Sequence, residues 1–245
     1  MQAHDAYFTI DAEALQDRSL AELAAGQPLP LRCAGLDLSG QDLSRISLPG
    51  AWFERCLLTG ADLTAANLIN TRWTSCRGGQ ANLRSAVLTD ARFERCDLNN
   101  TQWQRSKVAH ASFDGCKLTG AHFGDVSALG LSFSDCLLNS AMLSGISFYK
   151  SQLHNIDFSE ADLTYCDFRK AVFVDGGSLS MARVNNARFD DADLREASLH
   201  GLRLVDAKLF KGAIISRSQA GMLLAGLGLT AVSYTHLTLP TIYSV

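Results

Sequence analysis

The chain repeats itself every five residues over most of its length. In blocks of five that begin at Leu36, we call the third residue the centre. The centre is Leu, Phe or Trp in 25 of the 28 consecutive blocks whose centres run from Leu38 to Phe173. The exceptions are Gly78, Val108 and Ala128. A helix needs an apolar period of 3.6 residues and a strand a period of 2, so neither explains this pattern.

A chain that turns every five residues winds into a coil with flat sides. The first residue of the block is Ala, Cys, Ser, Thr or Val in 22 of the 28 blocks, so the first and third residues can point inward while the second points outward. Two columns recur at every fourth block. One holds Cys56, Cys76, Cys96, Cys116 and Cys136 at the first position, and the other holds Phe53, Trp73, Phe93, Phe113 and Phe133 at the centre. Four blocks therefore complete one turn of a square coil.

The five-residue frame slips once and then continues. One extra residue falls at Asp175-Gly176-Gly177, which we interpret as a bulge that re-aims the wall, with a binding feature as the alternative. Seven further blocks have their centres at Leu179, Val184, Phe189, Leu194, Leu199, Leu204 and Leu209. The 35 blocks make nearly nine coils, or a rod about 40 Å long at about 4.8 Å per coil. At Gly78 we expect a cavity that Trp73 fills.

Several blocks share one short motif, Ala-Asp/Asn-Leu. It occurs at Ala61-Asp62-Leu63, Ala66-Asn67-Leu68, Ala81-Asn82-Leu83, Ala161-Asp162-Leu163 and Ala192-Asp193-Leu194. This motif resembles the repeat of the pentapeptide-repeat proteins, over about residues 36–214. The resemblance implies an all-β solenoid, a right-handed quadrilateral β-helix of about nine coils.

A solenoid has two open ends that need covers. We expect residues 1–32 to form an N-terminal cap, 33–214 the β-helix and 215–232 a C-terminal capping helix. In the first cap, residues 7–10 can add a strand, Asp11 can cap a short helix, and Ser19 with Glu22 predicts a capping box for a second helix.

The C-terminal helix begins with a second predicted capping box, at Ser216 and Gln219. Its apolar stripe is Ala220, Leu223, Leu224 and Leu227. The family resemblance implies that such a helix also helps to form a homodimer, and a cap without a dimer is the alternative. Residues 233–245 differ from everything before them and resemble translated sequencing-adapter tails, so we expect them to be non-native.

Charge and cysteine content restrict the setting. The chain has 22 Lys and Arg against 25 Asp and Glu, which argues against direct binding of nucleic acid. The start shows no signal-peptide pattern, and the most apolar tract, 219–232, is shorter than the roughly 20 residues that span a bilayer. Seven Cys is an odd number and favours reduced thiols. We therefore expect a cytoplasmic protein without a membrane segment.

No group of residues has the pattern of a catalytic or metal site. Four of the six His, at positions 110, 122, 154 and 200, occupy outward block positions and do not share a column in neighbouring coils. The cysteine column is inward, so we interpret it as packing. Aspartate recurs at the second block position, which favours turn chemistry over acid–base work: Asp37, Asp42, Asp62, Asp97, Asp157, Asp162, Asp167 and Asp193. We expect no catalytic residue, no cofactor-binding residue, no metal ligand and no enzyme.

Two functions remain open. The first is a non-catalytic scaffold that binds an unidentified protein through its flat walls. The second is implied by the family resemblance: a DNA mimic that binds DNA gyrase or topoisomerase and protects it from quinolones or toxins. Mimicry needs acidic columns, but residues 33–214 hold 20 acids and 19 bases. Basic residues lie on the wall that carries Phe53 and Phe93: Arg55, Arg72, Arg92 and Arg95. Residues 125–167 are the most acidic stretch, with six acids against Lys150. We favour the scaffold.

Overall fold

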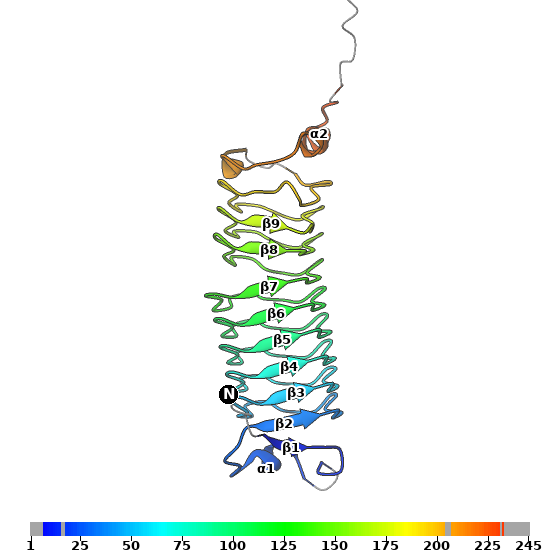
Figure 1. The fold of residues 1–245 in the computed structure, drawn as a ribbon, viewed down its shortest axis with the longest axis vertical. Coiled ribbons are helices and arrows are strands. Elements are labelled where there is room, and N and C mark those ends of the chain that lie inside the picture. Colours follow the sequence, from blue (N-terminus) through cyan, green and yellow to red (C-terminus); the bar gives the residue numbers. More distant parts are fainter. Residues whose placement is uncertain (1–6, 16–17, 204–206, 231, 233–245) are drawn as a thin grey trace, which may run out of the picture.

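The protein is a straight stack of coils with a helix at each end (Figure 1). The computed structural model describes residues 7–15, 18–203, 207–230 and 232. The predicted foreign tail, 233–245, and the predicted centre Leu204 therefore lie outside the described residues.

One wall of the stack is a parallel sheet of nine short strands in chain order. The strands are β1 (Phe8–Ile10), β2 (Leu31–Ala34), β3 (Trp52–Glu54), β4 (Arg72–Thr74), β5 (Arg92–Glu94), β6 (Ser112–Asp114), β7 (Ser132–Ser134), β8 (Gln152–His154) and β9 (Val172–Val174). From β2 to β9, each strand belongs to the coil after that of the strand before it. We call this the strand wall.

The other three walls pair through single backbone bridges. Asp37 pairs with Leu57, Asp42 with Asp62 and Ser47 with Asn67, which gives one bridge per block on the second, third and fourth walls. Parallel bridges of this kind continue to Ile214. The four-sided all-β solenoid predicted from the four-block period is confirmed.

The corners of the coil have a fixed chemistry. Within the described part of the chain, every non-glycine residue with positive φ stands at the fifth position of a block, including bulky ones such as Tyr165 at 61° and Met181 at 58°. Each aspartate predicted to do turn chemistry accepts a hydrogen bond from the backbone N–H two residues later, for example Asp37 from Ser39 and Asp62 from Thr64. The recurrent aspartates therefore stabilise turns, as expected.

Aromatic side chains fill the core in two ladders. On the strand wall, Phe53, Trp73, Phe93, Phe113 and Phe133 stack with successive ring centroids 4.0, 5.4, 4.7 and 5.2 Å apart. In the next coil Leu153 takes this column, and a second ladder begins on the fourth wall. It holds Phe148, Phe168, Phe189 and Phe210, at 4.8, 4.8 and 4.6 Å. The predicted aromatic column from Phe53 to Phe133 is thus confirmed, and a second ladder follows it on the fourth wall.

Two irregularities of the repeat have a local explanation. An apolar void of about 10 Å³ borders Gly78, Trp73 and Leu98, so the predicted cavity exists but is small. At the slip, Asp157 lies opposite Ser178, one position beyond the regular register, which is a one-residue bulge. A Cβ on Gly177, whose φ is 109°, would lie 2.7 Å from a backbone oxygen of the preceding coil, so only glycine fits there.

The last predicted centre, Leu209, is wrong. Residues Ala207–Phe210 form the 3₁₀ helix η1, and the ring of Phe210 stacks on Phe189. The bridge from Asp193 to Ile214 again lies one position beyond the regular register. A second extra residue therefore shifts the frame, and Phe210 takes the inward place that the periodicity assigned to Leu209.

The helices at the two ends of the solenoid both begin with the predicted capping boxes. Ser19 caps α1 (Leu20–Ala24), and Ser216 caps α2 (Arg217–Gly226). Asp11 accepts from the N–H of Ala14, but residues 12–15 form a turn and not a helix.

Helix α2 does not bury the stripe that the sequence predicts. Leu223 is buried, whereas Leu224 and Leu227 are exposed. Gln219 is buried instead, and its side-chain amide donates to the carbonyls of Leu194 and Ala197 at 2.6 and 2.7 Å. The helix is therefore attached to the last coils by a polar contact as well as an apolar one.

Candidate interaction surface

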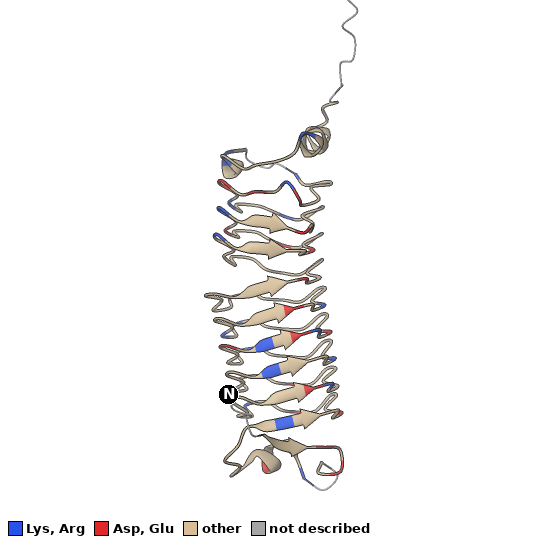
Figure 2. Ribbon diagram, in the orientation of Figure 1, with Lys and Arg blue, Asp and Glu red and all other residues tan. Residues whose placement is uncertain are grey.

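The outward residues of the strand wall form charged columns. At the second block position, Arg32, Trp52, Arg72 and Arg92 follow one another in register. At the fourth position, the column on the same face reads Glu54, Thr74, Glu94 and Asp114 in register, so three of its four residues are acidic. Figure 2 shows the basic positions on β2, β4 and β5 and the acidic positions at the ends of β3, β5 and β6. We call these residues the charged face.

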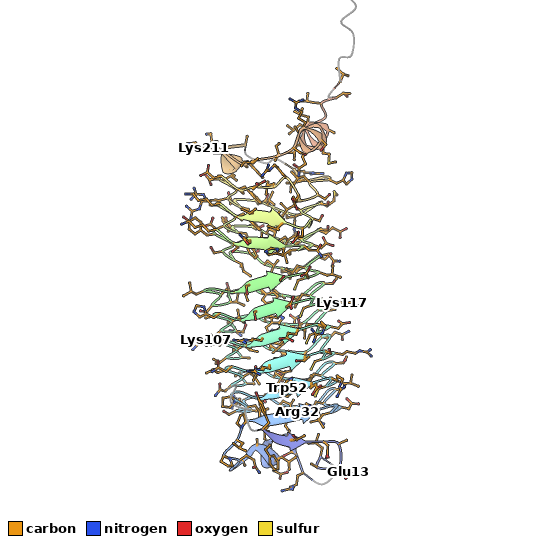
Figure 3. The ribbon with its side chains drawn as sticks, viewed as in Figure 1. Glu13, Arg32, Trp52, Lys107, Lys117 and Lys211 are labelled. Atoms are coloured by element: carbon orange, nitrogen blue, oxygen red, sulfur yellow. The ribbon has the colours of Figure 1, made fainter. Side chains whose placement is uncertain are left out.

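Contacts within the charged face hold part of it in place. The guanidinium of Arg32 lies 4.7 Å from the ring centroid of Trp52 and 2.6 Å from Glu54. Trp52 donates its indole N–H to Thr74 at 3.2 Å. Arg55 lies 3.5 Å from Glu54. In Figure 3, Arg32 and Trp52 lie on this wall, and Lys107 and Lys117 extend from the two sides of the stack.

The sequence identified only part of this surface. Of the four arginines expected on this wall, Arg72 and Arg92 lie on its strands. The other two, Arg55 and Arg95, stand at the corner where the wall ends. Trp52 and Glu54 were missed, although each shares its column with residues of the following coils. They would have been found if outward residues four blocks apart had been compared in the same way as the inward residues.

The acidic stretch 125–167 is partly neutralised by arginines. Asp162 pairs with Arg183 at 3.2 Å, and Asp167 forms two hydrogen bonds with Arg169. The Arg169 guanidinium lowers the pKa of Asp167 below its usual range. A stretch that is acidic in composition therefore presents fewer uncompensated charges than its composition predicts.

The histidines are dispersed, as the sequence indicates. His154 lies 3.2 Å from Asp175, and His122 lies 2.6 Å from Gln104, so these two have side-chain partners. Within the described part of the chain, no group of three or more His, Cys, Asp or Glu side chains is placed to hold a metal ion. None of the described helices has the length and apolar character to cross a bilayer.

The cysteine column is buried and stacked, as predicted. All seven cysteines are buried and unpaired by disulfides. In the column, each thiol donates to a backbone carbonyl of the preceding coil, from Cys56 to Cys33 at 3.2 Å up to Cys136 to Phe113 at 3.5 Å.

Burial sets the acidity of these thiols. It raises the pKa of Cys33 and of Cys166 to about 12. Within the stack, hydrogen bonds from neighbouring thiols lower the pKa of Cys76 and Cys116 and raise that of the others. Cys76 and Cys116 are therefore the more acidic thiols of the column, and burial keeps alkylating reagents away from all five column thiols in the folded protein.

Comparison with known proteins agrees with the architecture. The family model described as Pentapeptide repeat region matches residues 46–123, and the model described as Pentapeptide repeats (8 copies) matches residues 151–175 and 178–209. Together they cover more than half of the chain, which belongs to the pentapeptide-repeat family. Curated proteins gave no match in sequence.

Solved structures share the fold. Full-length QnrB1, a plasmid-mediated fluoroquinolone resistance protein, matches with a TM-score of 0.69 and 23% identity, over 81% of this chain and 100% of its own. A trypsin-treated variant of QnrB1 matches with a TM-score of 0.65 and 23% identity, over 83% and 98%. HetL of Nostoc sp. strain PCC 7120 gives a TM-score of only 0.45 at 22% identity, over 71% and 84%. At these identities the likeness concerns the fold.

Proposed function

We propose that this chain is a non-catalytic scaffold that binds a protein partner through its charged face. The observation that carries the proposal is the register of that face: basic and aromatic residues in one column and acidic residues in the next, on a flat parallel sheet. Arg and Trp are enriched where protein interfaces have their strongest contacts. A face that carries both signs of charge complements a protein surface that also carries both signs. Such a face does not repel polyanions or polycations as a whole.

The test reverses charge on one wall at a time. The full chain, immobilised, is used to capture and cross-link partners from the native cell extract. The double variant Arg72→Glu with Arg92→Glu alters the charged face, and Lys107→Glu with Lys117→Glu makes the same change in net charge on the neighbouring walls. We expect the first variant to lose the captured partner and the second to keep it. Equal retention by both variants would exclude the charged face.

The alternative function is a DNA mimic that binds DNA gyrase and protects it from quinolones or toxins. It is supported by the fold likeness to QnrB1 over the whole of that chain. The charges argue against it, because Arg72 and Arg92 lie in adjacent register and Asp162 and Asp167 have arginine partners. A gyrase supercoiling assay with and without quinolone decides the matter: no effect at micromolar protein removes this candidate.

The C-terminal helix supports a further proposal, a homodimer. Met222 and Leu224 on α2 and Leu227 at its C-cap are exposed, and exposed apolar residues of this kind favour association. Light scattering of the full chain and of a Leu224→Lys variant tests it, and a monomeric wild-type chain would contradict it. We also propose a cytoplasmic location, which is supported by the odd number of cysteines, all of them buried and outside any disulfide.

A further inference from the structure

Two neighbouring coils separate over part of their circumference. Among the described residues, the backbone N–H groups of Asp125, Ala128, Gly130 and Ser147 have no hydrogen-bond partner. One coil earlier, the counterparts of the first three donate at 2.8–3.0 Å: Arg105 to Gly124, Val108 to Ser127 and His110 to Leu129. The opening lies between residues 125–131 and 144–152, and we call it the fissure.

The fissure is closed at both ends. Before it, Phe123 donates to Met142 at 2.8 Å, and after it Asp135 donates to His154 at 2.9 Å. Strands β7 and β8 pair at one register position, whereas every other neighbouring strand pair shares three. The gap is therefore a local parting of the wall and not an end of the solenoid.

The cause lies in the core beneath the fissure. Ala128 is one of the three irregular centres, and it stands in the column between Val108 and Phe148. The aromatic ladder changes walls at this coil, so the ring of Phe148 meets Phe133 at 6.3 Å and 46° instead of stacking on it. A small centre below a large one gives the two coils cores of different size, and their backbones do not close on one another.

The size and lining of the fissure fit an extended peptide. Its volume is about 500 Å³. Three residues of strand, about 10 Å long, 4.8 Å wide and 10 Å deep, occupy roughly 480 Å³ by the standard sheet spacings. The apolar lining comes from Val126, Ala128, Leu129 and Ile146, and the polar lining from Asp125, Ser144 and Ser147. Leu129 is 75% exposed at the mouth.

We propose that the fissure receives an extended apolar segment of the protein partner, which adds a strand between the two coils. The proposal rests on the scaffold function and gives it a second, more specific site. The unpaired N–H groups follow one wall and its two corners, where Asp125 and Gly130 have positive φ, and they are satisfied best by another backbone that runs along that wall, as in other cases of strand addition. The apolar lining selects small apolar side chains at alternate positions of that segment.

The probe is a fluorescent peptide that copies residues 84–93 of this chain. That segment covers the same three walls as the fissure, two coils earlier, and is paired on both sides in the stack. Anisotropy titration with the full chain should show saturable binding. The same peptide with Val87→Pro, which lacks a backbone donor, should bind at least tenfold more weakly.

Two protein variants locate the binding. Ala128→Leu restores the usual centre, should let the coils close and should raise the melting temperature while weakening peptide binding at least tenfold. Gly78→Ala fills the other small centre, in a coil that is fully paired, and should leave peptide binding unchanged. Peptide binding that survives Ala128→Leu would place the peptide on an open end of the stack and overturn the proposal.

Amide exchange gives a readout that does not depend on the variants. The amides of Ala128 and Gly130 should exchange faster than those of Val108 and His110, and the peptide should slow them. Equal protection in the free protein, or no peptide binding, would overturn the fissure site. A partner from the charge-reversal experiment that still binds Ala128→Leu would leave the scaffold function intact and exclude the fissure alone.

Discussion

Phe113 is the most demanding test of the aromatic core. Its ring is 1% exposed and stacks between Phe93 at 4.7 Å and Phe133 at 5.2 Å. Trp103 and Phe123 meet it edge-on at 5.5 and 6.1 Å. A buried Phe→Ala change costs about 3–5 kcal/mol. Each aromatic pair is worth about 0.5–1.5 kcal/mol beyond burial, so four partners place Phe113→Ala at the upper end, near 5 kcal/mol.

The matched control is the next residue. Asp114 is exposed on the same strand, so Asp114→Ala should change the free energy of unfolding by no more than about 0.5 kcal/mol. Urea melts followed by circular dichroism measure both variants, and amide exchange shows whether the loss spreads from β6 to its neighbours. If Asp114→Ala proved as harmful as Phe113→Ala, the assignment of inward and outward positions would be wrong.

Three further outcomes follow from the ends, the corners and the ion pairs. A chain that ends before Ser216 loses the helix that caps the last coils and should aggregate in light scattering, whereas one that ends after Val232 should behave like the full chain; equal behaviour would remove the capping role. Tyr165→Gly should raise the free energy of unfolding by up to about 1 kcal/mol in urea melts. The left-handed backbone costs a residue with a side chain about 1–2 kcal/mol, and the greater entropy that glycine has in the unfolded chain offsets only part of this gain. A lower free energy of unfolding in the variant would contradict the strain. Hydrogen bonds from arginines lower the pKa of Asp167 and Asp193. The two ion pairs should therefore stabilise the fold above the unfolded pKa of about 4, and this stabilisation, less than about 1 kcal/mol for each partly exposed pair, should be lost as the pH falls through the folded pKa values. Urea melts whose midpoint does not change with acid would refute this contribution.

Periodicity predicted what depends on single positions. The inward places, the four walls and the turn-forming aspartates all follow from one residue type recurring at one block position. The capping boxes at Ser19 and Ser216 were predicted for the same reason, because each is a local hydrogen-bond pattern readable within a single turn of helix.

The features that the sequence did not predict depend on how residues in neighbouring coils fit together. Phe210 replaces Leu209 because an extra residue shifts the frame, and five-residue counting does not reveal where a coil absorbs it. Ala128 was noted as irregular, but the fissure arises from its size relative to Phe148 above it. The charged face was predicted only in part, because a net charge sums over residues that the fold places on different walls and does not show which of them share one.

Thiol labelling tests the inward register most directly. The cysteines at 33, 56, 76, 96, 116, 136 and 166 are all buried, and five of them form one column through the middle of the rod. With iodoacetamide and intact-mass spectrometry, the native protein should remain unlabelled, and all seven thiols should react once urea unfolds it. Rapid native labelling of the five column cysteines would mean that the first block position faces solvent, which would contradict the four-sided coil on which the charged face and the fissure depend.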